Sequence, residues 1–415
     1  MTVGIVGLGY VGLPLAVAFA ETGTTVVGVD VDDARVRALR EGKSPIGDVP
    51  GERLRELAGN LRFQTSYDAL AEVDAVLVCV PTPLSANREP DLGPLIAASD
   101  ALAGVLRAGQ LVVLESTTYP GTTRGEMRPR LEASGLRAGE DFNLAFSPER
   151  VDPGSRHYSV RNTPKLVGGL TAACGDRAEA VYGTICEEVV RVSTPEVAEL
   201  AKLLENIFRS VNIALVNELA VLSHRMGIDI WEVIGAAATK PFGFMRFDPG
   251  PGMGGHCLPI DPFYLAWRAR QYDFPTEFIE LAGKINQSQP YVCELRVAEA
   301  LNDVGKPVRG AKVLLVGVSY KPGVGDLRES PALKLVELLR RHGAEVSYHD
   351  PYVPELPEQG LRSRPLDDAV TDADVVVIVT AHPDVDHEAL VENAALTLDL
   401  RGVTAGLERP NLVRL

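Results

Sequence analysis

Residues 3–12, VGIVGLGYVG, decide the fold of the first part of the chain. They begin with an apolar run typical of a strand buried in a parallel sheet, and an apolar helical pattern follows over Leu13–Glu21. Between strand and helix stand Gly7, Gly9 and Gly12, spaced as GxGxxG. The first glycine permits a tight turn, the second lets a pyrophosphate approach the backbone, and the third lets the helix pack on the strand. The stretch therefore predicts a dinucleotide-binding turn that opens a buried helix.

Asp30 follows the next predicted strand, Thr25–Val29, about 20 residues after the glycines. A carboxylate at this place accepts hydrogen bonds from the hydroxyls of an adenosine ribose, and it would repel a 2′-phosphate. The pattern therefore favours NAD over NADP. Glycine-rich turns also occur in sheets that bind nothing, but here strand, helix and acidic residue are all in place.

The same alternation of strand and helix continues through roughly the first 190 residues, which predicts a doubly wound α/β domain with a parallel sheet. Further apolar strands are expected at Ala75–Val80, Leu111–Glu115 and Leu144–Phe146.

From Pro195 onward the pattern becomes helical. Val197–Arg225 contains neither Gly nor Pro and has apolar positions at helical spacing, far beyond the average helix of about 11 or 12 residues. Helices are also expected at Trp231–Ala238 and Pro275–Leu301, on either side of a glycine-rich loop, Pro249–Pro262.

The α/β pattern then returns and predicts a second, smaller Rossmann-type sheet. Its strands are expected at Lys312–Val318, Glu345–His349, Val375–Thr380 and Leu396–Leu400, with a helix at Ala332–His342. The predicted fold class is therefore α/β, with two Rossmann-type doubly wound domains joined by a long-helix central domain. The predicted domains are residues 1–195, 196–295 and 296–415.

Composition excludes several classes of protein. The net charge of −15 argues against nucleic-acid binding, which needs a basic face. The five cysteines contain no CxxC pair, so neither a disulfide framework nor a metal site is expected, and a reduced, cytoplasmic compartment fits best. Val3–Ala20 is apolar but contains four glycines and Pro14 and lacks a basic segment before it, so we expect a buried strand and helix rather than a signal peptide or membrane span.

Cys257 ends the glycine-rich loop, with His256 beside it and Asp261 four residues later. Glycines there suggest a close approach of the backbone to a ligand. The other four cysteines are interpreted as small buried hydrophobic residues. Lys202 and Asn206 are four residues apart and so share one helix face, but this spacing shows only that they could act together; a solvated helix lysine is the plain alternative.

Six ordered motifs span the whole chain. They are GLGYVG (7–12), ESTTYPG (115–121), SPER (147–150), ELAK (199–202) with Asn206, GGHCLPIDP (254–262), and Lys321 with DLRESP (326–331). In these motifs the chain resembles the nucleotide-sugar 6-dehydrogenases of the UDP-glucose/GDP-mannose dehydrogenase family, and within it the UDP-N-acetylglucosamine 6-dehydrogenases. It departs from the family pattern at Val151, at Arg246 and in the glycines between Lys321 and Asp326, which bear on sugar specificity rather than on the reaction.

The resemblance implies a four-electron oxidation of a sugar C6 alcohol to a carboxylate with NAD. Cys257 would attack the C6 aldehyde, and loss of a second hydride from the thiohemiacetal would give a thioester that water hydrolyses. Lys202 would support the developing alkoxide and Asn206 would be the oxyanion donor. The remaining catalytic residues implied are Asp261 and Thr117, for water and proton transfer, and Glu149, for thioester hydrolysis.

The resemblance also implies two sets of binding residues and a homodimer or higher homo-oligomer built on the long helix, which is apolar on more of its surface than one small domain can cover. The C-terminal domain would bind the UDP-sugar substrate. The cofactor-binding residues expected are Gly7, Gly9, Tyr10, Val11, Gly12, Asp30, Arg35, Pro81, Thr82, Ser116, Thr117 and Arg328. The substrate-binding residues expected are Glu149, Arg150, Lys202, Asn206, Gly252, Gly254, Gly255, Lys321 and Arg401.

Three other functions remain open from the sequence. One is oxidation of UDP-glucose or UDP-N-acetylmannosamine by the same chemistry. Another is a two-electron β-hydroxyacid-type dehydrogenase, which needs no cysteine. The third is a non-enzymatic, NAD-responsive binding protein, because fold alone does not define function.

Overall fold

The computed structural model describes residues 1–47, 49–85, 89–150, 157–255 and 260–415. The chain divides into two compact units. The first unit contains residues 1–205 and 263–274, and the second contains residues 206–262 and 275–415.

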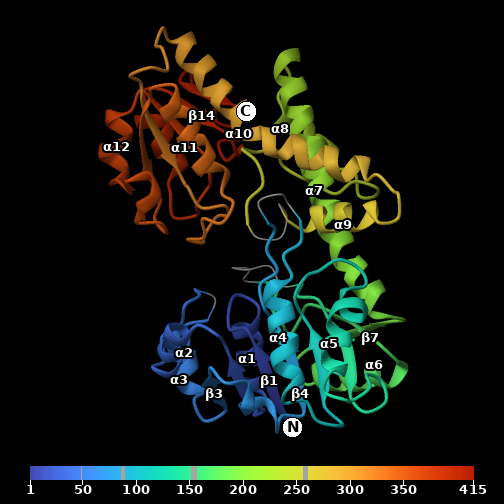
Figure 1. Ribbon diagram of the computed structural model, residues 1–415. Coiled ribbons are helices and arrows are strands. Elements are labelled where there is room, and N and C mark those ends of the chain that lie inside the picture. Colours follow the sequence, from blue (N-terminus) through green and yellow to red (C-terminus); the bar gives the residue numbers. More distant parts are fainter. Residues whose placement is uncertain (48, 86–88, 151–156, 256–259) are drawn as a thin grey trace. The chain divides into compact units, whose positions relative to one another are not determined.

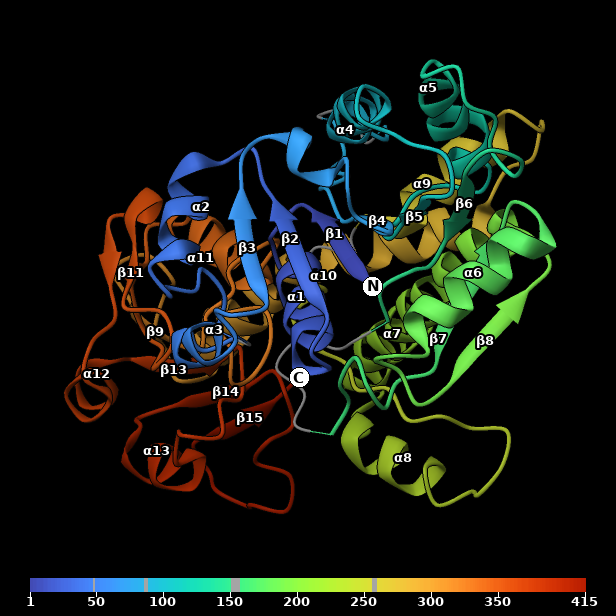
Figure 2. The same ribbon diagram turned by 90° about the horizontal axis from the view of Figure 1, so that it is seen from below.

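The first unit is built on an eight-stranded sheet of order β3-β2-β1-β4-β5-β6-β7-β8. Figure 2 shows β3, β2 and β1 running side by side. The first six strands pair in parallel, and their order is that of a dinucleotide-binding sheet. The strands are β1 (Thr2–Val6), β2 (Thr25–Val29), β3 (Leu61–Gln64), β4 (Ala75–Val78), β5 (Leu111–Leu114), β6 (Asn143–Phe146), β7 (Lys165–Gly169) and β8 (Val189–Val192).

The helices of this unit follow the strands in the expected alternation (Figure 1). They are α1 (Gly12–Glu21), α2 (Asp33–Arg40), α3 (Gly51–Glu56), α4 (Gly93–Ala103), α5 (Arg128–Glu132), α6 (Ala172–Tyr182) and the short turns η1 (Tyr67–Leu70) and η2 (Thr123–Met127). The core holds side chains from both faces of the sheet, such as Val3 and Ile5 of β1, Phe19 of α1 and Leu77 of β4. Burial on both faces explains why these strands read as continuous apolar runs.

One part of the sheet prediction was wrong. β6 and β7 are antiparallel, with Ala145 opposite Gly169, so the sheet is mixed rather than wholly parallel. Antiparallel neighbours need no crossover helix. The described residues between the two strands, 147–150 and 157–164, accordingly form neither helix nor strand, and Glu149 and Arg150 lie just after β6.

The second unit contains a five-stranded, wholly parallel sheet of order β10-β9-β13-β14-β15. Four of these strands were predicted, whereas β15 and the hairpin β11–β12 were not. The strands are β9 (Lys312–Val316), β10 (Glu345–His349), β11 (Glu355–Leu356), β12 (Leu361–Arg362), β13 (Val375–Ile378), β14 (Thr397–Asp399) and β15 (Leu412–Arg414). The helices are α8 (Ile230–Ala237), α10 (Glu277–Asp303), α11 (Pro331–Arg341), α12 (Leu366–Asp372), α13 (His387–Asn393) and the turn η3 (Pro357–Gln359).

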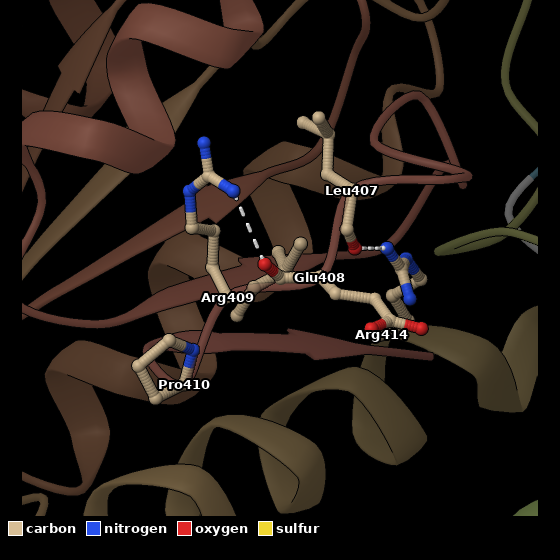
Figure 3. A pocket seen from close by; sticks show the side chains of 6 residues that line it. Leu407, Glu408, Arg409, Pro410 and Arg414 are labelled. Carbon is tan, nitrogen blue, oxygen red and sulfur yellow. Dashed lines mark hydrogen bonds between the residues drawn. The ribbon is translucent and has the colours of Figure 1, made fainter.

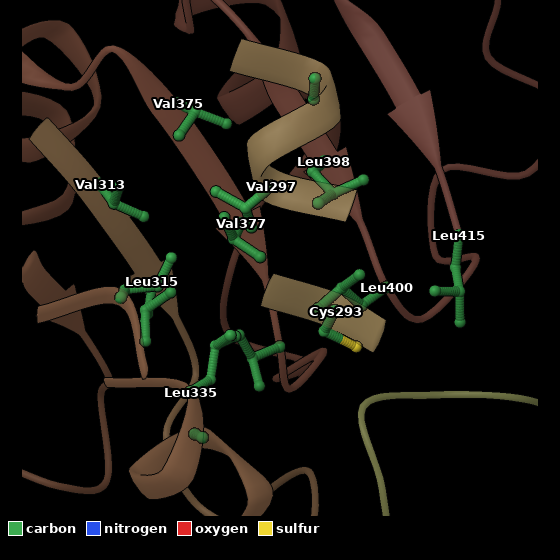
Figure 4. Packing of buried hydrophobic residues seen from close by; sticks show 14 of the residues in the cluster. Cys293, Val297, Val313, Leu315, Leu335, Val375, Val377, Leu398, Leu400 and Leu415 are labelled. Carbon is green, nitrogen blue, oxygen red and sulfur yellow. The ribbon is translucent and has the colours of Figure 1, made fainter. Parts of the chain in front are cut away.

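Helix α10 packs on this sheet through its apolar face. Figure 4 shows Cys293 and Val297 of α10 among Val377, Leu398 and Leu400, all of them buried. The second Rossmann-type core and the helix that precedes it in the chain therefore form one packed body.

The long helix predicted at 197–225 is confirmed as α7, Pro195–Met226, drawn in green in Figure 1. Its residues up to Glu205 belong to the first unit and the rest to the second. The three-domain division at 195 and 295 stays a prediction. Over the described ranges, no helix combines the length and apolar character needed to cross a membrane, and Val3–Ala20 is the strand and helix that we expected.

Candidate active site

The glycine turn has the close packing that its spacing predicts. Gly7 has a φ of +91°, and a Cβ on it would lie 2.6 Å from the carbonyl oxygen of Cys79. A Cβ on Gly12 would lie 1.9 Å from the carbonyl oxygen of Gly7, so turn and helix touch there. A Cβ on Gly9 would meet nothing within 4 Å. The turn is thus closed toward the sheet and open at Gly9, which fits the approach of a dinucleotide phosphate.

Asp30 lies at the carboxyl end of β2 with its carboxylate buried. Oδ2 accepts hydrogen bonds from the N–H of Leu8 at 2.8 Å and from Nη1 of Arg35 at 3.0 Å, and Oδ1 accepts from the N–H of Asp32 at 2.9 Å. A carboxylate offers about four acceptor positions, so it retains capacity for a ribose hydroxyl. Asp30 therefore ties the glycine turn to α2 while fitting the role expected for NAD.

The loops after β4 and β5 are joined at the same edge of the sheet. The hydroxyl of Thr82 donates to the carbonyl of Thr117 at 2.8 Å, and the hydroxyl of Ser116 donates to that of Val80 at 2.6 Å. The fully buried Tyr264 of α9 (Asp261–Arg270) donates its hydroxyl to the carbonyl of Thr82 at 2.6 Å. Four residues expected at the cofactor, Pro81, Thr82, Ser116 and Thr117, are thus held in one cluster, with Tyr264 as a support that sequence reasoning missed.

Glu199 fastens the segment after Thr117 to helix α7. Its buried carboxylate accepts from the N–H of Gly121 at 2.6 Å, and from the N–H and hydroxyl of Thr123 at 2.9 and 2.7 Å. Burial raises the pKa of Glu199, and these hydrogen bonds oppose part of that rise.

Lys202, one turn beyond Glu199, is only 9% exposed. The alternative of a solvated helix lysine is therefore wrong. Its ammonium makes no hydrogen bond or ion pair to any of the residues that the structure describes. A buried cation with no protein anion beside it is suited to an oxygen of a ligand.

Glu149 and Arg150 are anchored within the same unit. The guanidinium of Arg150 pairs with Glu205 at 2.8 Å and donates to the carbonyl of Pro164 at 2.8 Å. The N–H of Arg150 donates to Oε1 of Glu149 at 2.7 Å.

In the second unit, two predicted catalytic residues meet. Nδ2 of Asn206 donates to Oδ2 of Asp261 at 2.5 Å, and the two residues are 8% and 2% exposed. They are 55 residues apart in the chain, so their contact was not predictable from spacing. Cys257 and His256 lie outside the described residues.

Two buried asparagines hold the glycine-rich loop before Cys257. The N–H of Gly250 donates to Oδ1 of Asn217 at 2.9 Å, and Nδ2 of Asn217 donates to Oδ1 of Asn286 at 3.0 Å. Nδ2 of Asn286 in turn donates to the carbonyl of Ser210 at 3.0 Å. This amide chain joins α7, α10 and the loop, and the sequence gave no signal for it.

The loop glycines are explained by contacts within the protein. A Cβ on Gly254 would lie 2.5 Å from Cβ of Tyr320, and one on Gly255 would lie 3.0 Å from its ring. A Cβ on Gly250 would lie 2.7 Å from Nη1 of Arg401. We inferred a close approach to a ligand from these glycines; the structure shows a close approach to the chain's own side chains. The N–H of Gly255 also donates to the carbonyl of Arg328 at 2.9 Å.

The arginines expected at ligands are held by protein groups of the second unit. Nε of Arg401 donates to the carbonyl of Val379 at 2.7 Å, and burial lowers the pKa of Arg401. Arg328 forms an ion pair with Asp326 at 2.5 Å. The carbonyl of Lys321 accepts from the hydroxyl of Ser319 at 2.9 Å.

A cavity of about 410 Å³ lies at the edge of the second sheet (Figure 3). None of its lining residues is among the predicted site residues, and Arg414 inside it is engaged by the carbonyl of Leu407. We therefore place the candidate site at the loops described above. The residues lining the cavity are Leu407, Glu408, Arg409, Pro410, Leu412 and Arg414.

The fold and these loops define a dinucleotide-dependent dehydrogenase. Three family models match the chain in order: the NAD binding domain of the UDP-glucose/GDP-mannose dehydrogenase family over residues 1–186, its central domain over 196–288 and its UDP binding domain over 314–406. The chain belongs to this family and is an NAD-dependent UDP-sugar dehydrogenase.

Individual relatives agree over most of their length. A UDP-N-acetyl-D-glucosamine 6-dehydrogenase of Pseudomonas aeruginosa is 39% identical over 355 residues, covering 85% of this chain and 83% of that one. A UDP-N-acetyl-D-mannosamine dehydrogenase of Pyrococcus horikoshii is 37% identical, covering 92% of this chain and 90% of that one. A solved structure of a UDP-D-ManNAc dehydrogenase from Pyrococcus horikoshii superposes with a TM-score of 0.91 at 34% identity, over 100% of this chain and 99% of that one.

Proposed function

We propose that this enzyme oxidises the C6 alcohol of a UDP-N-acetylhexosamine, UDP-N-acetylglucosamine first among them, to the uronic acid through a thioester on Cys257. The observation that carries the proposal is the buried hydrogen bond from Asn206 to Asp261. It supplies an amide donor and a carboxylate four residues beyond the cysteine, which are the groups that a thiohemiacetal and its proton transfers require.

NAD supplies a hydride acceptor for each of the two oxidations, and the open turn at Gly9 and the acceptor Asp30 fit it. In the first oxidation Asp261 takes the hydroxyl proton while the ammonium of Lys202 stabilises the alkoxide. The Cys257 sulfur then bonds to the aldehyde carbon, and its proton passes to the oxygen. Asn206 donates to that oxygen in both tetrahedral species.

Hydrolysis completes the reaction. After the second hydride has left the thiohemiacetal carbon, a water adds to the thioester, and the carbon–sulfur bond breaks to release the carboxylate and the Cys257 thiolate. Glu149 takes the proton from that water, with Thr117 positioning it. The proposal thus gives every predicted catalytic residue a separate proton, charge or bond.

A second candidate substrate is UDP-N-acetylmannosamine. The reason is the extent of similarity to the Pyrococcus relative, whose fold matches across the full length of both chains. The chemistry at C6 is the same for both sugars, which differ in configuration at C2.

The test is a panel of UDP-N-acetylglucosamine, UDP-N-acetylmannosamine, UDP-N-acetylgalactosamine, UDP-glucose and GDP-mannose with NAD. We expect two NADH for each molecule of UDP-N-acetylglucosamine consumed, and the uronic acid as product. The control is Cys257→Ser, which should stop before the thioester. One NADH per sugar, or full four-electron turnover by Cys257→Ser, would contradict the cysteine mechanism and favour a two-electron dehydrogenase.

We also propose that the enzyme is a homodimer formed through α7. One face of this helix carries large apolar side chains that are 40–63% exposed, at the three- and four-residue spacing of a continuous stripe. Sedimentation should give twice the 44.5 kDa chain mass, and Leu215→Glu should give the monomer. A monomeric wild type at micromolar concentration would contradict this. The stripe is Val197, Leu200, Leu204, Phe208, Leu215, Leu219, Leu222 and Met226.

A further inference from the structure

A buried ionic cluster lies under the loops of the first unit. Nζ of Lys165, the first residue of β7, lies 2.7 Å from Oε2 of Glu115, which follows β5. Their side chains are 6% and 0% exposed. The hydroxyl of Tyr182, at the end of α6, donates to the other oxygen of Glu115. A buried ion pair is weak evidence for a role in stability, because desolvation offsets its attraction. The cluster therefore calls for another reason.

That reason is a second bond made by the same ammonium. Nζ of Lys165 also donates to the carbonyl of Pro148 at 3.1 Å, and Pro148 directly precedes Glu149. The neighbouring Arg150 is fixed by Pro164, the residue before Lys165. The segment that carries Glu149 is thus held on both sides by the start of β7.

Charge leads to the same residue. Burial disfavours the charged form of Lys165, but the negative charges of Glu115 and Glu149 overcome this and raise its pKa. The other titratable groups facing the cluster are Tyr182, Cys79 and Cys186, and burial raises the pKa of each, so all three are neutral near pH 7. One cation therefore serves two carboxylates, of which Glu115 is structural and Glu149 belongs to the proposed site.

We propose that Lys165 is a positioning residue for thioester hydrolysis: it fixes the Pro148 carbonyl and so aims the Glu149 carboxylate, while Glu115 holds Lys165 in place. This inference rests on the proposed function, because it takes from it the role of Glu149. Displacement of a reacting group by about 1 Å can cost about 100-fold in rate. Hydride transfer does not depend on Glu149, so only the last step should slow.

The test compares Lys165→Met, the double variant Glu115→Gln/Lys165→Met, and Lys165→Arg, with Lys43→Met as control. Lys43 pairs with Glu41 on the surface of the same unit. The double variant removes both buried charges at similar volume, a change that proteins commonly tolerate. Rapid mixing with NAD and UDP-N-acetylglucosamine separates the first release of NADH from steady-state turnover, and hydroxylamine cleaves any thioester that accumulates.

We expect the two neutral variants to keep the initial NADH release, to lose about 100-fold in steady-state rate, and to regain turnover with hydroxylamine. The acidic limb of their rate profile should move to higher pH, because the cation that favours the ionised Glu149 carboxylate is gone. Lys165→Arg should restore the wild-type pH profile, and Lys43→Met should match the wild type throughout.

A double variant that fails to fold, or that folds and hydrolyses at the wild-type rate with an unmoved pH profile, assigns the cluster to stability alone and overturns the proposal. The wild type is assayed first. If it releases one NADH per sugar, the proposed function fails whatever the variants do. If it releases two and the double variant hydrolyses normally, only the role of Lys165 fails.

Discussion

Asp30 and Asp350 make the same hydrogen bond in the two sheets of the chain. Oδ2 of Asp30, just after β2, accepts from the N–H of Leu8 at 2.8 Å, and Oδ2 of Asp350, just after β10, accepts from the N–H of Val318 at 2.7 Å. Leu8 and Val318 each follow a glycine of positive φ at the end of the first strand of their sheet. Both sheets therefore brace their first turn with the carboxylate that follows the neighbouring strand.

The outer sides of the two carboxylates differ. Asp30 faces Arg35, whose side chain is 36% exposed, whereas Asp350 is closed by His382 at 3.0 Å, with both side chains fully buried. The N–H of Gly323 donates to Nδ1 of the same histidine at 3.1 Å, so His382 ties Asp350 to the loop after Lys321. Only the first carboxylate is placed to meet a ribose.

This difference predicts opposite effects of one substitution. Asp30→Asn should raise KM for NAD about 10- to 100-fold, since hydrogen bonds to a charged group contribute about 1.5–3 kcal/mol, and it should narrow the preference for NAD over NADP. Asp350→Asn should lower the melting temperature and leave KM for NAD unchanged. Steady-state kinetics with both cofactors and thermal melting distinguish the two. Equal changes in KM for both variants would show that the assignment of Asp30 to the ribose is wrong.

The contact between Asn206 and Asp261 predicts strong coupling between two catalytic positions. Asn206→Ala should lower kcat about 100- to 1000-fold, as loss of one oxyanion donor does, with little change in KM for NAD. Asp261→Asn should cost at least as much, because it removes the proposed proton acceptor.

The double variant is the control for this pair. If the two side chains act as one unit, its kcat should be close to that of the weaker single variant rather than the product of both losses. Additive losses would mean that the hydrogen bond is structural and that the two residues act independently.

Thiol labelling tests the assignment of the nucleophile. Burial raises the pKa of Cys186 to about 11, of Cys293 to about 12, and of Cys79 well above its usual range; Cys174 is fully buried. The thiolate is the reactive form, so these thiols should resist iodoacetamide at pH 8 and become reactive only as the pH approaches their raised values. One label per folded chain, on Cys257, should accompany loss of activity, as read by mass spectrometry. Labelling of Cys257→Ser at the same rate would contradict this.

The buried amides that hold the glycine-rich loop predict a loss of both stability and turnover. Asn217→Ala leaves the N–H of Gly250 and Oδ1 of Asn286 without that partner, at about 1–3 kcal/mol for each buried group. The melting temperature should fall, and kcat should fall while KM for NAD stays constant. Asn212→Ala, on an accessible part of the same helix, is the control and should change neither. An unchanged kcat in folded Asn217→Ala would mean that the loop does not depend on this support.

Several site residues could be found from the sequence because their signal is local. The glycine turn, Asp30 and the pair Lys202 and Asn206 each follow from spacing within one turn or one βαβ unit. Their supports could not be found in this way. Tyr264 reaches a carbonyl 182 residues away, and Lys165 reaches Glu115 across 50 residues. No periodicity links such partners, because only the folded chain brings them together.

The sequence also led to one wrong structural inference and one incomplete one. The antiparallel pairing of β6 and β7 was missed because a strand's apolar pattern does not encode its direction. The glycines at 254 and 255 were recognised as sites of close approach, but the approaching group, Tyr320, lies in another part of the second unit.

The sequence by itself determined the two Rossmann-type sheets, the long helix α7 and the choice of NAD, since these depend on apolar periodicity and on groups at fixed short spacing. The tertiary structure alone decided that Lys202 is buried, that Asn206 meets Asp261, that β7 reverses direction, and that Lys165 holds the segment of Glu149. Burial and hydrogen bonding are properties of the surroundings of a side chain, and those surroundings exist only once distant segments have packed.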